Sequence, residues 1–270
     1  MLNTYFKLEL KRTLFSWRTI ISALIIMALL VIPYLKEFVI PYKGIRFPYL
    51  NPNLDGVQFY INASMVSYVG YIAPVVTALI YSTSIIKDKR SGFLEKLLKI
   101  IDIKTYFKAK VAINSLMTFL VFAFSHGIVM LYFIIVYGLK QTSEKGMYNG
   151  AFEGIYDSSK LLYILIILLV LTISAVAFSI FMLGITTATD SRVMAYLFPA
   201  FYVVLTGVIF QALSLNVVVN FNITYLFNLI IDNSARGYSV IVYDFVLVIL
   251  GIALLYQFGY KRTLKLYSEQ

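Results

Sequence analysis

Charged residues are almost absent from six long stretches of the chain, which alternate with segments rich in Lys and Arg. One charge at the centre of a bilayer costs about 2.5–3.5 kcal/mol, and a helix needs about 20 residues to cross it. The pattern therefore predicts six transmembrane helices. Their predicted ranges are 19–36, 63–86, 111–138, 161–185, 194–213 and 239–260.

The fifth apolar stretch is too long for one straight helix. It runs without charge from Val193 to Ile231, and its far part, "NVVVNFNITY", is polar and β-branched. We therefore expect a helix to about Leu213, followed by an irregular or re-entrant segment on the outer side over residues 214–238.

The composition supports a membrane protein. Hydrophobic residues make up 60% of the chain and charged residues 13%, against about 45–50% and 25% in soluble domains. We predict an all-α integral membrane protein with a single domain, 1–270. The chain has no Cys and one His, which excludes disulfides, thiolate sites and His-pair metal sites. We predict no catalytic residue and no bound metal.

The basic residues are distributed unequally between the two sides. Six spans put both termini on one side, which carries 16 Lys or Arg against 7 on the other. The positive-inside rule then places both termini in the cytoplasm. The formal charge of +10 is explained mainly by this orientation, and we predict no nucleic-acid partner.

The N-terminal segment, 1–18, is amphipathic. Its apolar positions recur at helical spacing, and most of its basic residues fall on the opposite face. Such a helix lies in the headgroup plane, either as an anchor alone or as an anchor that also contacts a cytoplasmic partner. The apolar face consists of Leu2, Tyr5, Phe6, Leu10, Thr13, Leu14 and Trp17.

A second amphipathic segment lies between spans two and three. Residues 87–110, "KDKRSGFLEKLLKIIDIKTYFKAK", carry eight Lys or Arg. Ser91 is placed to cap a helix that is too short to span a membrane. Periodicity alone leaves two interpretations, a basic interfacial helix held by headgroups or a docking helix. The apolar stripe consists of Phe93, Leu94, Leu97, Leu98 and Ile101.

The segment "DKRSGFLEKLL", with a basic residue before the next span, resembles the signature of ABC-2-type transporter permeases. Asp88 stands four residues before Gly92, a Glu and a Leu pair follow, and Lys110 closes the segment. The family often has a Pro after the Leu pair, whereas this chain has "KIIDIK", so its helix could continue past Ile101. The matching helix residues are Leu94, Glu95, Leu97 and Leu98.

The resemblance implies a permease subunit of a bacterial exporter in the plasma membrane. The short helix would be a coupling helix seated in a separate ATPase subunit, present in two copies with its ATP and Mg. A second permease subunit, identical or related, would complete the unit, and amphipathic peptides, antimicrobials or drugs would be the cargo. The chain has no Walker A motif, so it is not itself the ATPase. The implied contact residues are Asp88, Ser91, Gly92, Phe93, Leu94, Glu95, Leu97, Leu98 and Ile101.

Four further polar residues are candidates. His126, inside the third span, is either a proton or substrate site or a partner of Ser125 in a helix–helix contact. Asp244 lies near the outer end of the sixth span, where we expect water to reach it. Asp190 and Arg192 belong to a tight cytoplasmic turn that could also touch the ATPase.

Two other classes of function stay open from the residues. A secondary transporter or channel would need paired charges or broken helices inside the membrane. An intramembrane enzyme would need a zinc motif, which is absent, or paired catalytic residues such as His126 and Ser174.

Overall fold

We analysed a computed structural model of the chain, which describes residues 2–42, 54–140, 151–215, 219–230 and 237–268. Within these ranges the secondary structure is helical, with no strand. Six helices are long and apolar enough to cross a membrane, as predicted. They cover Trp17–Val39, Val69–Arg90, Ile103–Tyr137, Lys160–Thr189, Arg192–Ala212 and Gly237–Leu266.

Several spans are built from more than one helical piece. The regular pieces are α2 (Trp17–Tyr34), α5 (Val69–Tyr81), α6 (Ser84–Arg90), α8 (Ile103–Tyr137), α10 (Lys160–Thr189), α11 (Arg192–Val204), α12 (Phe210–Ala212), α14 (Gly237–Leu254) and α15 (Arg262–Ser268). Wider π-helical stretches continue or join three of the spans. They are Leu35–Val39, Leu205–Ile209 and Leu255–Lys261.

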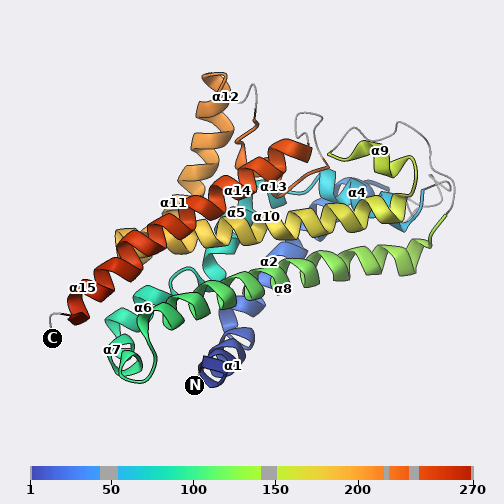
Figure 1. Cartoon of the computed structure of the whole chain (residues 1–270). Helices are drawn as coiled ribbons and strands as arrows, with labels where there is room; N and C mark the ends of the chain where they lie inside the picture. Colours follow the sequence, from blue (N-terminus) through green and yellow to red (C-terminus); the bar gives the residue numbers. More distant parts are fainter. Residues whose placement is uncertain (1, 43–53, 141–150, 216–218, 231–236, 269–270) are drawn as a thin grey trace.

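The remaining helices are short or lie outside the spans. Both termini, α1 and α7 lie toward one end of the bundle, and α4 and α9 lie toward the other (Figure 1). This agrees with an even number of spans. The helices are α1 (Leu2–Leu14), α4 (Gly56–Met65), α7 (Phe93–Leu98), α9 (Glu153–Tyr156) and α13 (Ile223–Leu226), and a 3₁₀ turn covers Ile40–Tyr42.

The second span begins at Val69, six residues later than predicted. The backbone N–H of Ser67 donates to the Ser64 carbonyl at 3.2 Å, and the Ser67 hydroxyl donates to the same oxygen at 2.7 Å. This turn separates α4 from α5 and divides one apolar stretch into two helices.

The third span begins at Ile103, eight residues earlier than the predicted residue 111. The carboxylate of Asp102 accepts a hydrogen bond from the Thr105 backbone N–H at 2.9 Å, which caps α8. Three lysines of the predicted loop, Lys104, Lys108 and Lys110, therefore belong to the start of a 35-residue helix.

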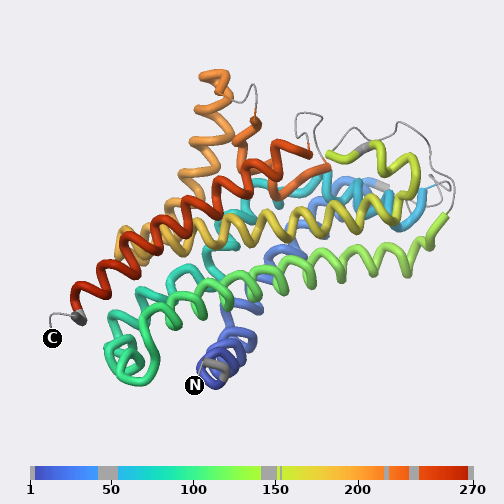
Figure 2. The backbone as a smooth tube through the Cα atoms, viewed as in Figure 1, coloured from blue at the N-terminus to red at the C-terminus, as the bar shows by residue number. Residues whose placement is uncertain are grey.

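Helix α10 is at the centre of the bundle, packed against both α8 and α14 (Figure 2). In its apolar stretch 61% of the residues are buried within the chain, against 17% in the fifth span. Helices α11 and α12 leave the bundle at a steep angle to α10 (Figure 1). The fifth span therefore has a large face that the described part of the chain does not cover.

A buried ion pair lies at the end of the bundle that carries α4 and α9. Asp55 caps α4 in a capping box with Gln58, and Lys160 Nζ lies 2.6 Å from Asp55 Oδ2. Of the predicted irregular segment 214–238, the described part contains α13, which packs on α5 and α10. Residues 216–218 and 231–236 lie outside the described ranges.

Candidate functional site

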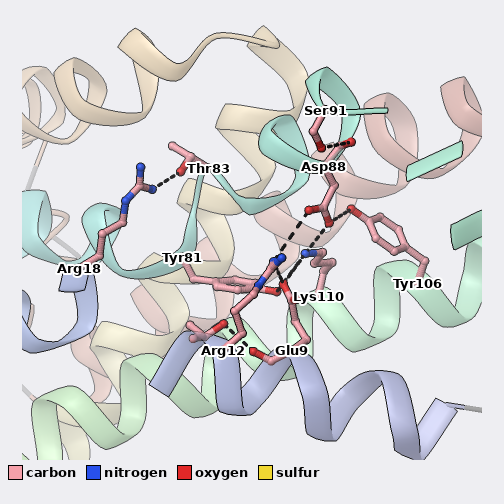
Figure 3. Close-up of polar contacts among 10 residues, drawn as sticks. Glu9, Arg12, Arg18, Tyr81, Thr83, Asp88, Ser91, Tyr106 and Lys110 are labelled. Atoms are coloured by element: carbon pink, nitrogen blue, oxygen red, sulfur yellow. Dashed lines mark hydrogen bonds and ion pairs between the residues drawn. The ribbon is translucent and has the colours of Figure 1, made fainter. Parts of the chain in front are cut away.

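A cluster of buried charges joins three elements at the end of the bundle that carries both termini (Figure 3). Glu9 comes from α1, Asp88 from α6 and Lys110 from α8. Their side chains are 4%, 3% and 0% exposed. Burying a charge is costly unless it is paired, so these three side chains need one another as partners.

Lys110 is at the centre of the cluster. Its Nζ lies 2.8 Å from Glu9 Oε1, 2.7 Å from Asp88 Oδ2 and 3.1 Å from the Tyr81 hydroxyl. The ammonium group thus donates hydrogen bonds to Glu9 and Tyr81 and forms an ion pair with Asp88. The ring centroids of Tyr81 and Tyr106 lie 5.1 and 5.5 Å from Nζ, respectively.

The two carboxylates have further donors. Glu9 Oε1 accepts from the Tyr81 hydroxyl and from Arg12 Nη2, both at 2.7 Å. Asp88 Oδ2 accepts from the Tyr106 hydroxyl at 3.0 Å, and Arg12 lies 4.0 Å from Oδ1. Two acids thus face two bases, and the cluster is neutral as a whole.

The protonation of Glu9 follows from this environment. Burial by itself would raise the pKa of the Glu9 carboxyl. The Lys110 ammonium and the hydrogen bonds from Lys110 and Tyr81 together outweigh burial, so the pKa of Glu9 lies below its ordinary value. Glu9 is therefore ionised near neutral pH.

Helix α1 contacts the bundle through part of its predicted apolar face, because Tyr5, Phe6 and Leu10 are partly buried against the core. Glu9 and Thr13 are buried, whereas Leu14 and Trp17 are exposed. The Thr13 hydroxyl donates to the Glu9 carbonyl at 2.8 Å. Part of the predicted apolar face thus packs on the bundle beside Glu9, whereas Leu14 and Trp17 lie on the outside. That this outer part lies in the headgroup plane remains a prediction.

The cap of the short helix differs from the prediction. Gly92, with φ of 68°, stands at the N-cap of α7 and provides no side-chain hydrogen bond. The Ser91 hydroxyl instead donates to the Asp88 carbonyl at 3.1 Å, at the end of α6. Ser91 therefore does not cap α7, and Gly92 supplies the left-handed turn that reverses the chain.

Helix α7 is shorter than expected and ends at Leu98, before Ile101. The predicted apolar stripe divides into two groups. Leu94, Leu97 and Ile101 are buried in a small core with side chains of α6 and α8. Phe93 is exposed, Leu98 is half-buried, and Ile100, which the helical spacing did not single out, is 62% exposed.

Asp190, a predicted contact residue for the ATPase, is bound within this chain to the end of α6. Lys89 forms an ion pair with the Asp190 carboxylate, and Arg90 Nη2 donates to the Asp190 carbonyl at 3.1 Å. The turn between spans four and five is thus tied to α6. Arg192 lies exposed at the start of α11.

His126 and Asp244 both have partners inside the bundle that the sequence did not indicate. His126 Nδ1 lies 2.7 Å from the Tyr60 hydroxyl, while Ser125 donates to the Ala23 carbonyl. The predicted His126–Ser125 contact is therefore wrong. Asp244 is buried and accepts from the Ser174 hydroxyl at 2.8 Å, so the predicted access to water is also wrong.

Among the described residues, no group of three or more His, Cys, Asp or Glu side chains could hold a metal ion. No family model, curated protein or solved structure matches this chain. The resemblance of residues 88–110 to ABC-2-type permeases therefore rests on the residues alone.

Proposed function

We propose that the chain is the membrane subunit of an ATP-driven exporter of the ABC-2 type, with a separate ATPase docked on the α6–α7 hairpin. The observation that carries this proposal is the 2.7 Å ion pair between Asp88 and Lys110. These two residues begin and end the segment that resembles the family signature. Their pairing, completed by Glu9, fixes the hairpin to the spans and to α1.

The contacts of the hairpin connect α7 to several spans. Its buried residues Leu94 and Leu97 hold α7 against α6 and α8, and α6 continues α5 after a short turn. The Thr186 hydroxyl donates to the Ser82 carbonyl in that turn at 2.7 Å, which ties it to α10. A displacement of α7 by a closing ATPase dimer would therefore move several spans together.

The outward surface of the hairpin is the proposed docking surface. Apolar and charged side chains are combined there, a mixture that gives both contact area and partner selection. The exposed residues are Phe93, Glu95, Lys96, Lys99 and Ile100. ATP and Mg would be bound by the partner, in two copies.

A second permease subunit, identical or related, is part of the proposed unit. The uncovered apolar face of α11 supports this, because the chain buries only 17% of the residues in that apolar stretch. With both termini in the cytoplasm of a bacterium, hydrophobic or amphipathic cargo, such as a peptide, an antimicrobial or a drug, would move outward.

The test is affinity purification of the tagged full chain from the membranes of its own cells, with a non-hydrolysable ATP analogue. We expect an ATP-binding subunit to co-purify in equal number. The double substitution Phe93→Asp and Ile100→Asp should abolish that association, because it places two charges on the docking surface without touching Leu94 or Leu97.

Phe15→Asp is the matched control, since Phe15 is 72% exposed in the turn between α1 and α2. It should leave the complex intact. The proposal is wrong if no ATP-binding subunit co-purifies, or if the double variant keeps both the complex and cargo-stimulated ATP hydrolysis.

A secondary transporter is the alternative function, and the buried carboxylate of Asp244 in the sixth span favours it. Intramembrane acids frequently carry ion coupling. In that case transport in vesicles would depend on an ion gradient, continue without ATP, and be lost in Asp244→Asn.

A further inference from the structure

A groove opens on the side of the bundle between the start of α8 and the end of the sixth span. It has a volume of about 610 Å³. Phe107 and Leu255 are buried at its floor. Gly259 lets the two helices approach, because a Cβ there would stand 2.7 Å from the Phe107 ring.

The groove has a basic end and an apolar end. Lys104 and Lys108, one turn apart on α8, are both exposed along it. Val111, Ala112 and Ile252 line the part farther from the chain termini. From Lys104 to Ala112 the helix rises about 12 Å. Over this length the surface changes from charged to apolar, as a lipid does from its headgroup to its acyl chains.

Aromatic side chains occupy the level between these two ends. Tyr256 and Tyr260 stack with ring centroids 5.6 Å apart, and Lys261 Nζ lies 5.1 Å from the Tyr256 centroid. Tyrosines with one apolar and one polar edge prefer the membrane–water interface. Lysines beside them can bind a phosphate group as point charges.

Lys104 and Lys108 form no ion pair within the described ranges. Asp102, the nearest acid along the chain, caps α8 through the Thr105 N–H and attracts Lys104 only from beyond ion-pair distance. The groove therefore has positive charge available for a ligand. The two exposed lysines favour an acidic ligand over another basic surface.

We propose that this groove binds one anionic phospholipid. Its phosphate lies between Lys104 and Lys108, and an acyl chain follows Val111 and Ile252. Basic pockets between spans at the cytoplasmic side are suited to acidic headgroups. This inference requires only that the helices span a membrane, so it stands or fails independently of any ATPase.

The test is titration of the purified full chain with phosphatidylglycerol and with phosphatidylcholine of the same acyl chains, followed by native mass spectrometry. We expect the wild type to bind phosphatidylglycerol about 10-fold or more tightly than phosphatidylcholine. Each lysine near an anionic headgroup contributes roughly a fivefold preference, so Lys104→Gln with Lys108→Gln should remove it.

Lys96→Gln with Lys99→Gln is the matched control, with the same loss of charge on the exposed side of the hairpin. It should keep the preference. Ala112→Trp should weaken binding of both lipids, because it fills the apolar end. The proposal is overturned if the Lys104 and Lys108 variant keeps the preference, if the control loses it equally, or if Ala112→Trp binds both lipids like the wild type.

Discussion

Glu9 Oε1 and Lys110 Nζ lie 2.8 Å apart, although 101 residues separate them along the chain. Both side chains are buried. Helix α1 is thus held to the bundle by a charge pair. An interfacial anchor alone would not need this contact, and the same lysine also pairs with Asp88 of α6.

Replacement of Lys110 by Met should strongly destabilise the protein. The variant leaves the carboxylates of Glu9 and Asp88 buried without the ammonium between them, and breaking a buried pair in this way costs about 3–5 kcal/mol. Thermal unfolding in detergent would measure the loss. Lys99→Met, at an exposed site, is the control and should unfold like the wild type.

The triple variant Glu9→Gln, Asp88→Asn, Lys110→Met should recover most of that stability, because it leaves no unpaired charge among these three. If the triple variant is as unstable as Lys110→Met, packing rather than charge is the cause.

The stability of the cluster should fall in acid. The pKa of Glu9 is lowered in the folded protein, so the stabilisation is complete above the ordinary glutamate pKa of about 4.3. It is lost as the pH falls through the lower, folded value. The midpoint of thermal unfolding should therefore change little between pH 7 and 5 and then decrease. In Glu9→Gln the decrease below pH 5 should be smaller, and parallel curves would contradict the assignment.

The six spans could be predicted from the sequence because charge is expensive in lipid, and the charge-free stretches mark where it is avoided. The same rule predicts that the third span begins at residue 111, because it assigns the charged Lys110 to the loop. In the structure, Glu9 and Asp88 pair with Lys110 and allow it to be buried in α8. Pairing over 101 residues leaves no periodic pattern in the sequence.

The short helix α7 shows a second feature that the sequence cannot predict, namely which surface covers an apolar stripe. Helical spacing identified an apolar stripe over Phe93, Leu94 and Leu97, but the spacing cannot tell whether the covering surface belongs to this chain or to a partner. The structure buries Leu94 and Leu97 against α6 and α8 and leaves Phe93 exposed. Only the exposed part remains available for docking.

If the second permease subunit is an identical copy, it should be detectable at the uncovered face of α11. Leu197 is 60% exposed in that helix, and the chain has no cysteine of its own. A single Leu197→Cys variant in native membranes should therefore form a cross-linked dimer with a short bis-maleimide. Ile135→Cys, on an 80% exposed position of α8, is the control and should stay monomeric. Equal cross-linking at both sites would indicate random collision.

Two glycines permit the close contact between α10 and α14. A Cβ on Gly184 would stand 2.6 Å from the Gly251 carbonyl oxygen, and a Cβ on Gly251 would stand 2.7 Å from backbone atoms of Ile180 and Phe181. Backbone cannot rotate away as a side chain can, so the helices would have to separate. Small residues are frequent where spans pack this closely.

Gly251→Ala should accordingly destabilise the protein by about 1–3 kcal/mol, the usual cost of overpacking. Gly127→Ala is the matched control, because Gly127 lies in α8 and a Cβ added there would meet nothing within 4 Å. There the higher helix propensity of Ala should raise stability by up to about 1 kcal/mol. The two changes add the same methyl group to a membrane helix, so unfolding midpoints that shift in opposite directions would isolate the α10–α14 contact. A shift in the same direction at both sites would contradict the close approach of Gly184 and Gly251.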